Sequence, residues 1–199
     1  MFWDKVSPVY DVFENVYNHK VYTNTGKRVA EEITADDLVL ECACGTGEIS
    51  RYIARRCRYL IATDMSAGML KRTKKKLAGF GNFKVGKADI THLRCSDERF
   101  DKVVAGNVIH LLDDPYAAMK ELMRVCKPGG KVVIPTYINR CGDKDRKAVK
   151  FLEAAGAKFN RQFDIFSYKE FFDEMGYTDA DYTVVDGRMP CAIAVITKK

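Results

Sequence analysis

A short apolar run that ends in a turn of small residues constrains the fold of this chain most strongly. Residues 38–40 are apolar and lead into the sequence Glu-Cys-Ala-Cys-Gly-Thr-Gly at 41–47, after which we expect a helix from Gly47 to about Cys57. Small residues between a strand and a helix let a ligand approach the backbone where a larger side chain would collide. The pattern predicts a site for a nucleotide-like ligand at this turn.

An acidic residue follows the next expected strand. Residues 59–63 form a second short apolar run, and Asp64 comes directly after it, 17 residues past Gly47. A carboxylate in this position can accept hydrogen bonds from both hydroxyls of a ribose. The turn and Asp64 together therefore favour a nucleotide-like ligand more strongly than either does alone.

Two other nucleotide-binding classes fit the turn less well. Ser50 stands where a dinucleotide fingerprint of the form G-x-G-x-x-G has its third glycine, so pyrophosphate binding loses support. No Gly-Lys-Ser or Gly-Lys-Thr follows the turn, so the sequence has no Walker-type loop either.

Strands and helices alternate along the first two thirds of the sequence. A helix with Met69, Leu70, Thr73 and Leu77 on one face follows Asp64, and another is expected over 115–126, stopped by residues 127–130. This alternation predicts an α/β fold with a mostly parallel sheet. The expected strands begin with 38–40 and continue with 59–63, 82–85, 102–106 and 131–137.

The pattern changes after residue 137. The sequence predicts a basic helix near 145–155 and a short helix over 167–175. Two alternating runs, 178–186 and 191–197, flank a Gly-Arg-Met-Pro turn and predict an antiparallel hairpin. No linker separates the hairpin from the rest, so we expect it to complete the edge of the same sheet.

Length and composition indicate one globular domain over residues 1–199, because domains average about 150 residues. No apolar stretch approaches the roughly 18 residues that a membrane span requires, and the N-terminus shows no export or import signal. We therefore expect a cytoplasmic protein. The seven cysteines are scattered without paired CxxC clusters, so neither a zinc site nor a disulfide framework is expected.

The positive charge is concentrated in one segment. The formal net charge is +6, yet residues 51–76 hold nine Lys and Arg against one acid, Asp64. Solvated helix faces are the favoured interpretation, with a weak contact to an anionic membrane surface as the alternative. No aromatic residues alternate with the lysines, as base stacking would require, so nucleic acid is not expected as a partner. The oligomeric state stays open.

Several motifs together resemble the class I S-adenosylmethionine-dependent methyltransferases, in the group similar to ubiquinone/menaquinone biosynthesis methyltransferases. The resemblance covers nearly the whole sequence and implies a Rossmann-like three-layer sandwich, with a seven-stranded, mostly parallel sheet and a reversed terminal hairpin. Ala43 is the one departure, since the family usually has glycine there. The motifs lie at residues 2–11, 41–47, 64–66 with Met69 and Leu70, 88–89, 100–104 and 124–130.

The resemblance also implies which residues hold the cofactor S-adenosylmethionine and its product S-adenosylhomocysteine. Glu41 and the turn at 43–47 would hold the methionyl part, Asp64 the ribose, and Asp89 with Ile90 the adenine. The full set of candidate cofactor contacts is Tyr10, Glu41, Ala43, Cys44, Gly45, Thr46, Gly47, Asp64, Met65, Met69, Asp89, Ile90 and Asn107.

The N-terminal segment is a candidate lid over this site. Residues 9–33 carry apolar side chains at helical spacing and predict two helices or one kinked helix, with 24–26 as an interruption. We expect residues 1–33 to form a helical lid. Its tyrosines could face a sulfonium, because aromatic rings attract cations. The candidate substrate contacts are Tyr17, Tyr22 and Tyr137.

Methyl transfer from a sulfonium is an in-line displacement, so positioning and exclusion of water can supply much of the catalysis. His110 follows the strand over 102–106 and is a candidate general base; the alternative is a packed, hydrogen-bonded histidine. We expect an enzyme that methylates a small molecule. The alternatives are lipid or quinone head-group methylation at a membrane surface and a module that binds the cofactor without catalysis; methylation of an RNA base or of arsenite is less favoured.

Overall fold

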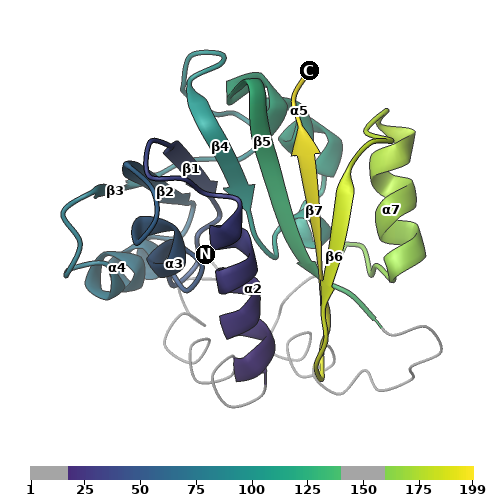
Figure 1. Ribbon diagram of the computed structural model, residues 1–199, viewed down its shortest axis with the longest axis horizontal. Helices are drawn as coiled ribbons and strands as arrows, with labels where there is room; N and C mark the ends of the chain where they lie inside the picture. Colours follow the sequence, from purple (N-terminus) through teal and green to yellow (C-terminus); the bar gives the residue numbers. More distant parts are fainter. Residues whose placement is uncertain (1–17, 140–159) are drawn as a thin grey trace.

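The computed structural model describes residues 18–139 and 160–199, and its centre is one seven-stranded sheet (Figure 1). The strand order is β3-β2-β1-β4-β5-β7-β6; neighbours from β3 to β5 are parallel, and β7 is antiparallel to both β5 and β6. The strands are β1 Leu38–Cys42, β2 Tyr59–Asp64, β3 Phe83–Lys87, β4 Phe100–Ala105, β5 Cys126–Tyr137, β6 Asp181–Val185 and β7 Cys191–Thr197.

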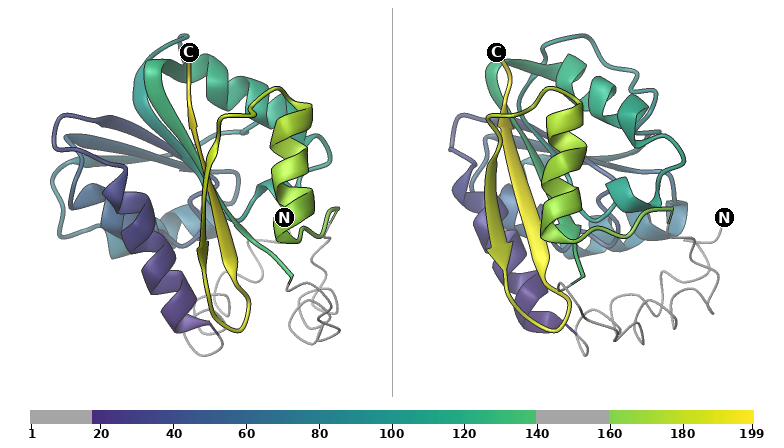
Figure 2. Two further views of the ribbon diagram at one scale, coloured as in Figure 1. Left: turned by 45° about the vertical axis from the view of Figure 1, so that its right-hand side comes forward. Right: turned by 90° about the vertical axis from the view of Figure 1, so that its right-hand side faces the viewer.

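Helices cover both faces of the sheet and make a three-layer sandwich (Figures 1 and 2). α2, α3 and α4 lie on one face, and α5 and α7 lie on the other. The described helices are α2 His19–Glu31, α3 Ser50–Ala54, α4 Ala67–Lys76, the short 3-10 helix η1 Ile109–Leu111, α5 Pro115–Val125 and α7 Ile165–Glu174.

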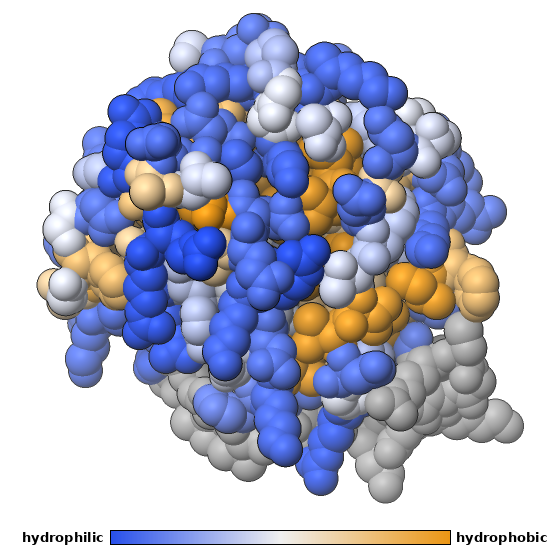
Figure 3. Space-filling view, in the orientation of Figure 1, coloured by the Kyte–Doolittle hydropathy of each residue, from blue (hydrophilic) through white to orange (hydrophobic). Residues whose placement is uncertain are grey.

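Each face of the sheet has its own apolar core. On the α2 side, Val29 and Ile53 pack with Val104 of the central strand β4. On the opposite side, Met119 of α5 and Phe172 of α7 belong to the second core. The strands at the centre are therefore buried on both faces, as parallel sheets usually are. Figure 3 shows apolar residues beside α2, over β5, β7 and β6, with hydrophilic residues over most of this face.

The predicted fold class and the antiparallel terminal hairpin are confirmed. The predicted start of the fifth strand at residue 131 is wrong, because β5 begins at Cys126, directly after α5. Residues 127–130 do end the helix, but they continue as extended chain: Gly129 N donates to Lys198 O at 2.7 Å, and Lys198 N donates to Gly130 O at 2.9 Å. The helix expected near 145–155 lies outside the described residues.

α2 runs without a break through residues 24–26, so the predicted interruption is absent from this helix. Gly26 serves packing instead: a Cβ there would lie 2.3 Å from Cδ2 of Tyr52 on α3. At its start, α2 is tied to the hairpin turn, because Asn18 Nδ2 donates to Met189 O at 2.8 Å. α2 therefore rests on α3 and on the turn between β6 and β7.

No helix among residues 18–139 and 160–199 is long and apolar enough to cross a membrane.

The contact between α2 and α3 predicts the effect of a methyl group at Gly26. Alanine is normally about 1 kcal/mol better than glycine inside a helix. At Gly26 we expect the opposite sign, because the added Cβ would overlap the Tyr52 ring; overpacking of this kind costs about 1–3 kcal/mol. Urea unfolding of Gly26→Ala measures the loss. Gly79→Ala is the control, since no atom lies within 4 Å of the added Cβ. Greater stability of Gly26→Ala would contradict the packing described.

Candidate functional site

A cavity of about 210 Å³ lies where the strand order reverses, at the carboxyl ends of β1 and β4. Loops that leave two neighbouring parallel strands in opposite directions open a crevice between them, which is the usual ligand site of such folds. The lining residues come from α2 and α4, from the ends of β1, β2 and β3 with the loops that follow them, and from the segment after β4. They are Tyr22, Glu41, Ala43, Cys44, Gly45, Ile49, Asp64, Met65, Met69, Ala88, Ile90, Gly106, Asn107, Val108, Leu111 and Leu112.

The glycine turn forms one wall of the cavity and is held from two sides. Gly45 N donates to Asp64 Oδ2 at 2.9 Å, and Thr73 Oγ1 of α4 donates to Gly45 O at 2.7 Å. Gly45 and Gly47 have φ values of +54° and +82°, a region that glycine adopts without steric cost. A Cβ on Gly47 would also lie 3.0 Å from Thr73. The turn therefore needs glycine at these two positions, as the sequence predicts.

Ala43 occupies a strained position in the same turn. Its φ is +52°, which explains why the family usually has glycine here. The side chain lines the cavity, so its methyl group narrows the space beside the turn.

Replacing Ala43 with glycine tests this strain. We expect Ala43→Gly to raise the free energy of unfolding by about 0.5–1 kcal/mol, because glycine relieves the positive φ and this gain exceeds its entropic cost. Ala54→Gly is the matched control: Ala54 is buried in α3, where glycine should lower stability. Urea unfolding of both variants measures the difference; a loss at both positions would show that Ala43 is not strained.

Asp64 joins the turn to α4. Its Oδ2 accepts from Gly45 N, and its Oδ1 accepts from Ser66 N at 2.8 Å. Ser66 in turn caps α4, since its Oγ accepts from Met69 N at 3.1 Å. Each carboxylate oxygen has two acceptor sites, so these bonds leave Asp64 with capacity to accept a ligand hydroxyl.

Glu41 is a buried carboxyl in the wall of the cavity. It is 2% exposed, and burial raises its pKa to about 8; the charge of Asp64 raises the pKa further, while a hydrogen bond from Ser50 opposes the shift. A raised pKa favours folding below about pH 4.5, and this contribution is lost as the pH rises through 8. A cationic ligand group near Glu41 would favour its charged form.

The side of the cavity toward β4, which we call the apolar end, has an apolar lining. It is formed by Ile49 of the first loop together with Val108, Leu111 and Leu112 after β4. Gly106 fits here because a Cβ would lie 2.6 Å from Ile49 Cδ1. The cavity therefore combines a polar end at the glycine turn with an apolar end after β4.

Asn107 and two tyrosines lie beside the apolar end. Asn107 has a φ of +54°; its N–H donates to Pro135 O at 2.7 Å, and its Oδ1 accepts from Tyr137 N at 3.1 Å. Tyr137 stacks on Tyr22 with 6.4 Å between ring centroids. Tyr22 lines the cavity, and Tyr137 lies behind it.

The other predicted site residues lie outside the cavity lining. Thr46 and Gly47 of the turn do not line the cavity; Thr46 is buried, and its Oγ1 lies 3.5 Å from Lys76 Nζ. Asp89 follows β3, and its Oδ1 accepts from Thr91 N at 2.9 Å, a bond that lowers the pKa of Asp89. Its neighbours Ala88 and Ile90 do line the cavity, so Asp89 lies beside its rim. Tyr10 and Tyr17 lie outside the described residues.

His110 is buried in η1, with 7% of its surface exposed, and does not line the cavity. Burial lowers its pKa to about 4, so the imidazole is neutral near pH 7. A general base works best when its pKa lies near the working pH. The environment of His110 therefore favours the alternative of a packed histidine over the role of general base. The catalytic role stays a prediction without support from this geometry.

The predicted site set omits six residues that line the cavity. Ala88 belongs to a motif that carries the resemblance, and Gly106 ends the strand whose carboxyl end was expected to face the ligand. The motif and the strand end could therefore have pointed to Ala88 and Gly106. The other omitted residues contribute only apolar surface, and no residue type marks them in the sequence. The omitted residues are Ile49, Ala88, Gly106, Val108, Leu111 and Leu112.

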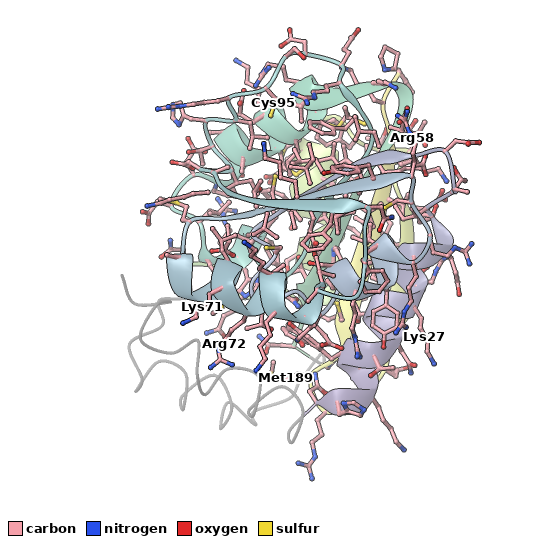
Figure 4. All side chains as sticks on the ribbon, turned by 90° about the vertical axis from the view of Figure 1, so that its left-hand side faces the viewer. Lys27, Arg58, Lys71, Arg72, Cys95 and Met189 are labelled. Atoms are coloured by element: carbon pink, nitrogen blue, oxygen red, sulfur yellow. The ribbon has the colours of Figure 1, made fainter. Side chains whose placement is uncertain are left out.

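The basic segment is less continuous in space than in sequence. Arg51 and Lys76 both form ion pairs with Glu48, which reduces the local charge. Figure 4 shows Lys71 and Arg72 at the lower edge of the molecule and Arg58 near the opposite edge. The contact with an anionic membrane surface stays a prediction.

The sheet order, the glycine turn after β1 and the acid at the end of β2 agree with the fold and the motifs that the resemblance to S-adenosylmethionine-dependent methyltransferases implies. Residues 40–134 match the family described as Methyltransferase domain. This match confirms the resemblance that the motifs predict.

Curated relatives are similar over about two thirds of the chain. Demethylmenaquinone methyltransferase of Clavibacter sepedonicus is 33% identical over 135 residues, which cover 66% of this chain and 55% of the relative. Ubiquinone/menaquinone biosynthesis C-methyltransferase of Bdellovibrio bacteriovorus is 31% identical over 137 residues, covering 66% and 58%. The chain thus spans little more than half the length of the curated relatives it matches.

Solved structures share the fold along nearly the whole chain. A SAM-dependent methyltransferase from Thermotoga maritima is 20% identical with a TM-score of 0.74, covering 100% of this chain and 98% of that one. Magnesium protoporphyrin IX methyltransferase from Synechocystis, with bound S-adenosylhomocysteine, is 14% identical with a TM-score of 0.68, covering 93% and 88%.

Proposed function

We propose that this protein transfers the methyl group of S-adenosylmethionine to a small-molecule acceptor. One observation carries the proposal: a single cavity is lined both by Glu41, the glycine turn and Asp64 and by the apolar residues that follow β4. The polar end has the groups that a charged nucleoside cofactor needs, and the apolar end offers room for a second molecule.

The residues at the polar end fit the cofactor. Glu41 would bind the amino group of the methionyl part, because a buried carboxyl is stabilised in its charged form by a cation. Asp64 would accept from the ribose hydroxyls, and the backbone at Gly45, where no side chain intervenes, would lie against the ligand. Ile90 with the neighbouring Asp89 would hold the adenine.

When bound, the cofactor supplies an activated methyl group on a sulfonium. The chain then has to orient the acceptor in line with that methyl group and keep water away. Leu111 and Leu112 exclude water at the apolar end, and Tyr22 presents an aromatic ring to the same cavity. Both carboxylates in the described lining, Glu41 and Asp64, belong to the polar end, where the cofactor would bind. The main contribution of Leu111, Leu112 and Tyr22 is therefore to position the acceptor.

An apolar ring compound of the quinone type is the acceptor class we propose. The named relatives act on demethylmenaquinone or in ubiquinone and menaquinone biosynthesis. The apolar surface of Val108, Leu111 and Leu112 beside the Tyr22 ring suits such a molecule. The alternative is a module that binds the cofactor without catalysis, which would transfer no methyl group to any acceptor.

The N-terminal segment would cover the site. α2 contributes Tyr22 to the cavity and is tied by Asn18 to the hairpin turn, so the described part of the segment lies against the site. This supports residues 1–33 as a lid, of which 1–17 lie outside the described residues.

Asp64 gives a direct test of the cofactor. Asp64→Asn keeps the shape of the side chain but removes its charge, and charge-assisted hydrogen bonds are worth about 1.5–3 kcal/mol. We expect the Kd for S-adenosylhomocysteine, measured by calorimetry, to rise about ten- to a hundredfold. Asp36→Asn, at an exposed loop acid, should leave the Kd unchanged. Tight binding of NAD by the wild type without any response to S-adenosylhomocysteine would overturn the assignment.

Transfer of a labelled methyl group from S-adenosylmethionine to a demethylated menaquinol tests the reaction and its acceptor. We expect Tyr22→Ala to lower kcat/KM more than about tenfold, because the acceptor loses an aromatic contact in the cavity. Tyr59→Ala is the control, since Tyr59 is the first residue of β2, at the opposite end of that strand from Asp64 and the cavity. Cofactor binding without transfer to any acceptor would favour the non-catalytic module.

A further inference from the structure

Ser50 places a buried hydroxyl directly behind the polar end of the cavity. It is the first residue of α3, is fully buried, and its Oγ donates a hydrogen bond to Glu41 Oε2. Ser50 also stands where a dinucleotide fingerprint has its third glycine. Ser50, the residue by which this turn differs from a dinucleotide fingerprint, thus contacts the carboxylate of Glu41.

Glu41 is held at both its backbone and its side chain. Thr63 Oγ1 of β2 donates to Glu41 O at 3.0 Å, and Ser50 binds the carboxylate from α3. Two neighbouring elements therefore define the direction in which Glu41 points. Ser50 does not use its hydroxyl to cap α3, because Ile49 is the N-cap residue and makes no capping bond through its side chain.

We propose that Ser50 is a positioning residue for the cofactor: its hydroxyl holds the Glu41 carboxylate toward the cavity in the charged form that binds the amino group of the methionyl part. This inference rests on the proposed function. A hydroxyl that donates to a carboxylate stabilises its charged form, because the donor contributes partial positive charge beside the oxygen. In the fraction of the free protein in which the Glu41 carboxyl is protonated, this proton would pass to solvent when the cationic amino group binds.

The other groups around Glu41 either oppose its ionisation or are neutral, whereas the Ser50 hydroxyl favours it. Asp64 faces Glu41 from the end of β2, and its negative charge and the burial of Glu41 both oppose ionisation. The thiols of Cys42 and Cys44 adjoin Glu41 along β1 and the turn; burial raises both pKa values, so they stay neutral below pH 9. Tyr22 of α2 lines the same cavity. Among these described neighbours, Ser50 favours the charged carboxylate.

The test is the pH dependence of S-adenosylhomocysteine binding, measured by calorimetry from pH 6 to pH 9 on the wild type and three variants. Ser50→Ala removes the hydroxyl, and Ser50→Cys replaces it with a weaker donor of similar shape. Thr136→Val is the matched control, because it removes a fully buried hydroxyl on β5 that does not contact Glu41.

We expect Ser50→Ala to weaken binding about tenfold at pH 7, in line with the loss of one hydrogen bond to a charged group. The ratio of the two Kd values should fall toward pH 9, where Glu41 ionises in both proteins. Ser50→Cys should show the same trend with a smaller effect, and Thr136→Val should keep the wild-type pH profile.

A loss of affinity that is equal at every pH would show a structural role for Ser50 and overturn the inference, as would unchanged binding by Ser50→Ala. If the wild type binds S-adenosylhomocysteine normally, either result leaves the proposed function intact. Failure of the wild type to bind at any pH would instead overturn the proposed function.

Discussion

The hydrogen bond between Gly45 N and the Asp64 carboxylate is the interaction on which the site depends. It joins the turn after β1 to the end of β2, and Thr73 extends the connection to α4 through Gly45 O. The left-handed backbone at Gly45 and Gly47 brings the turn close enough for these bonds to form. One local geometry thus sets the polar wall of the cavity and places the acid expected to bind a ribose.

The reversal of strand order supplies the rest of the cavity. Because β4 lies on the other side of β1 from β2, the segment after β4 faces the glycine turn across an open crevice. Gly106 and Asn107 follow β4, where Gly106 lies close to Ile49 and Asn107 N donates to Pro135 O. The polar end consequently follows β1 and β2, and most of the apolar end follows β4, an arrangement that suits two molecules that must meet.

The charge of Glu41 at the polar end depends on two opposing effects: burial favours the neutral carboxyl, and hydrogen bonding favours the carboxylate. Glu41 is buried beside a second carboxylate, an arrangement that opposes its ionisation unless a cation or a donor compensates. Ser50 provides the donor within the protein, and the proposed cofactor provides the cation. A buried acid of this kind costs stability near neutral pH, which is common where a residue is kept for binding.

Local sequence patterns were sufficient for the strand-turn-helix junction, the alternation of elements and the terminal hairpin, because small residues, apolar periodicity and turn residues act over a few positions. The family resemblance, in contrast, marked Ala43 as a departure, and the positive φ at this position explains why glycine is usual there. Contacts between distant segments lay beyond these patterns. Stacking of Tyr22 on Tyr137, the Ser50 bond to Glu41 and the burial of His110 arise only when separate elements pack together. The apolar end of the cavity was missed for the same reason: Val108, Leu111 and Leu112 resemble any core residues in sequence, and only the packing of the chain leaves them facing a cavity.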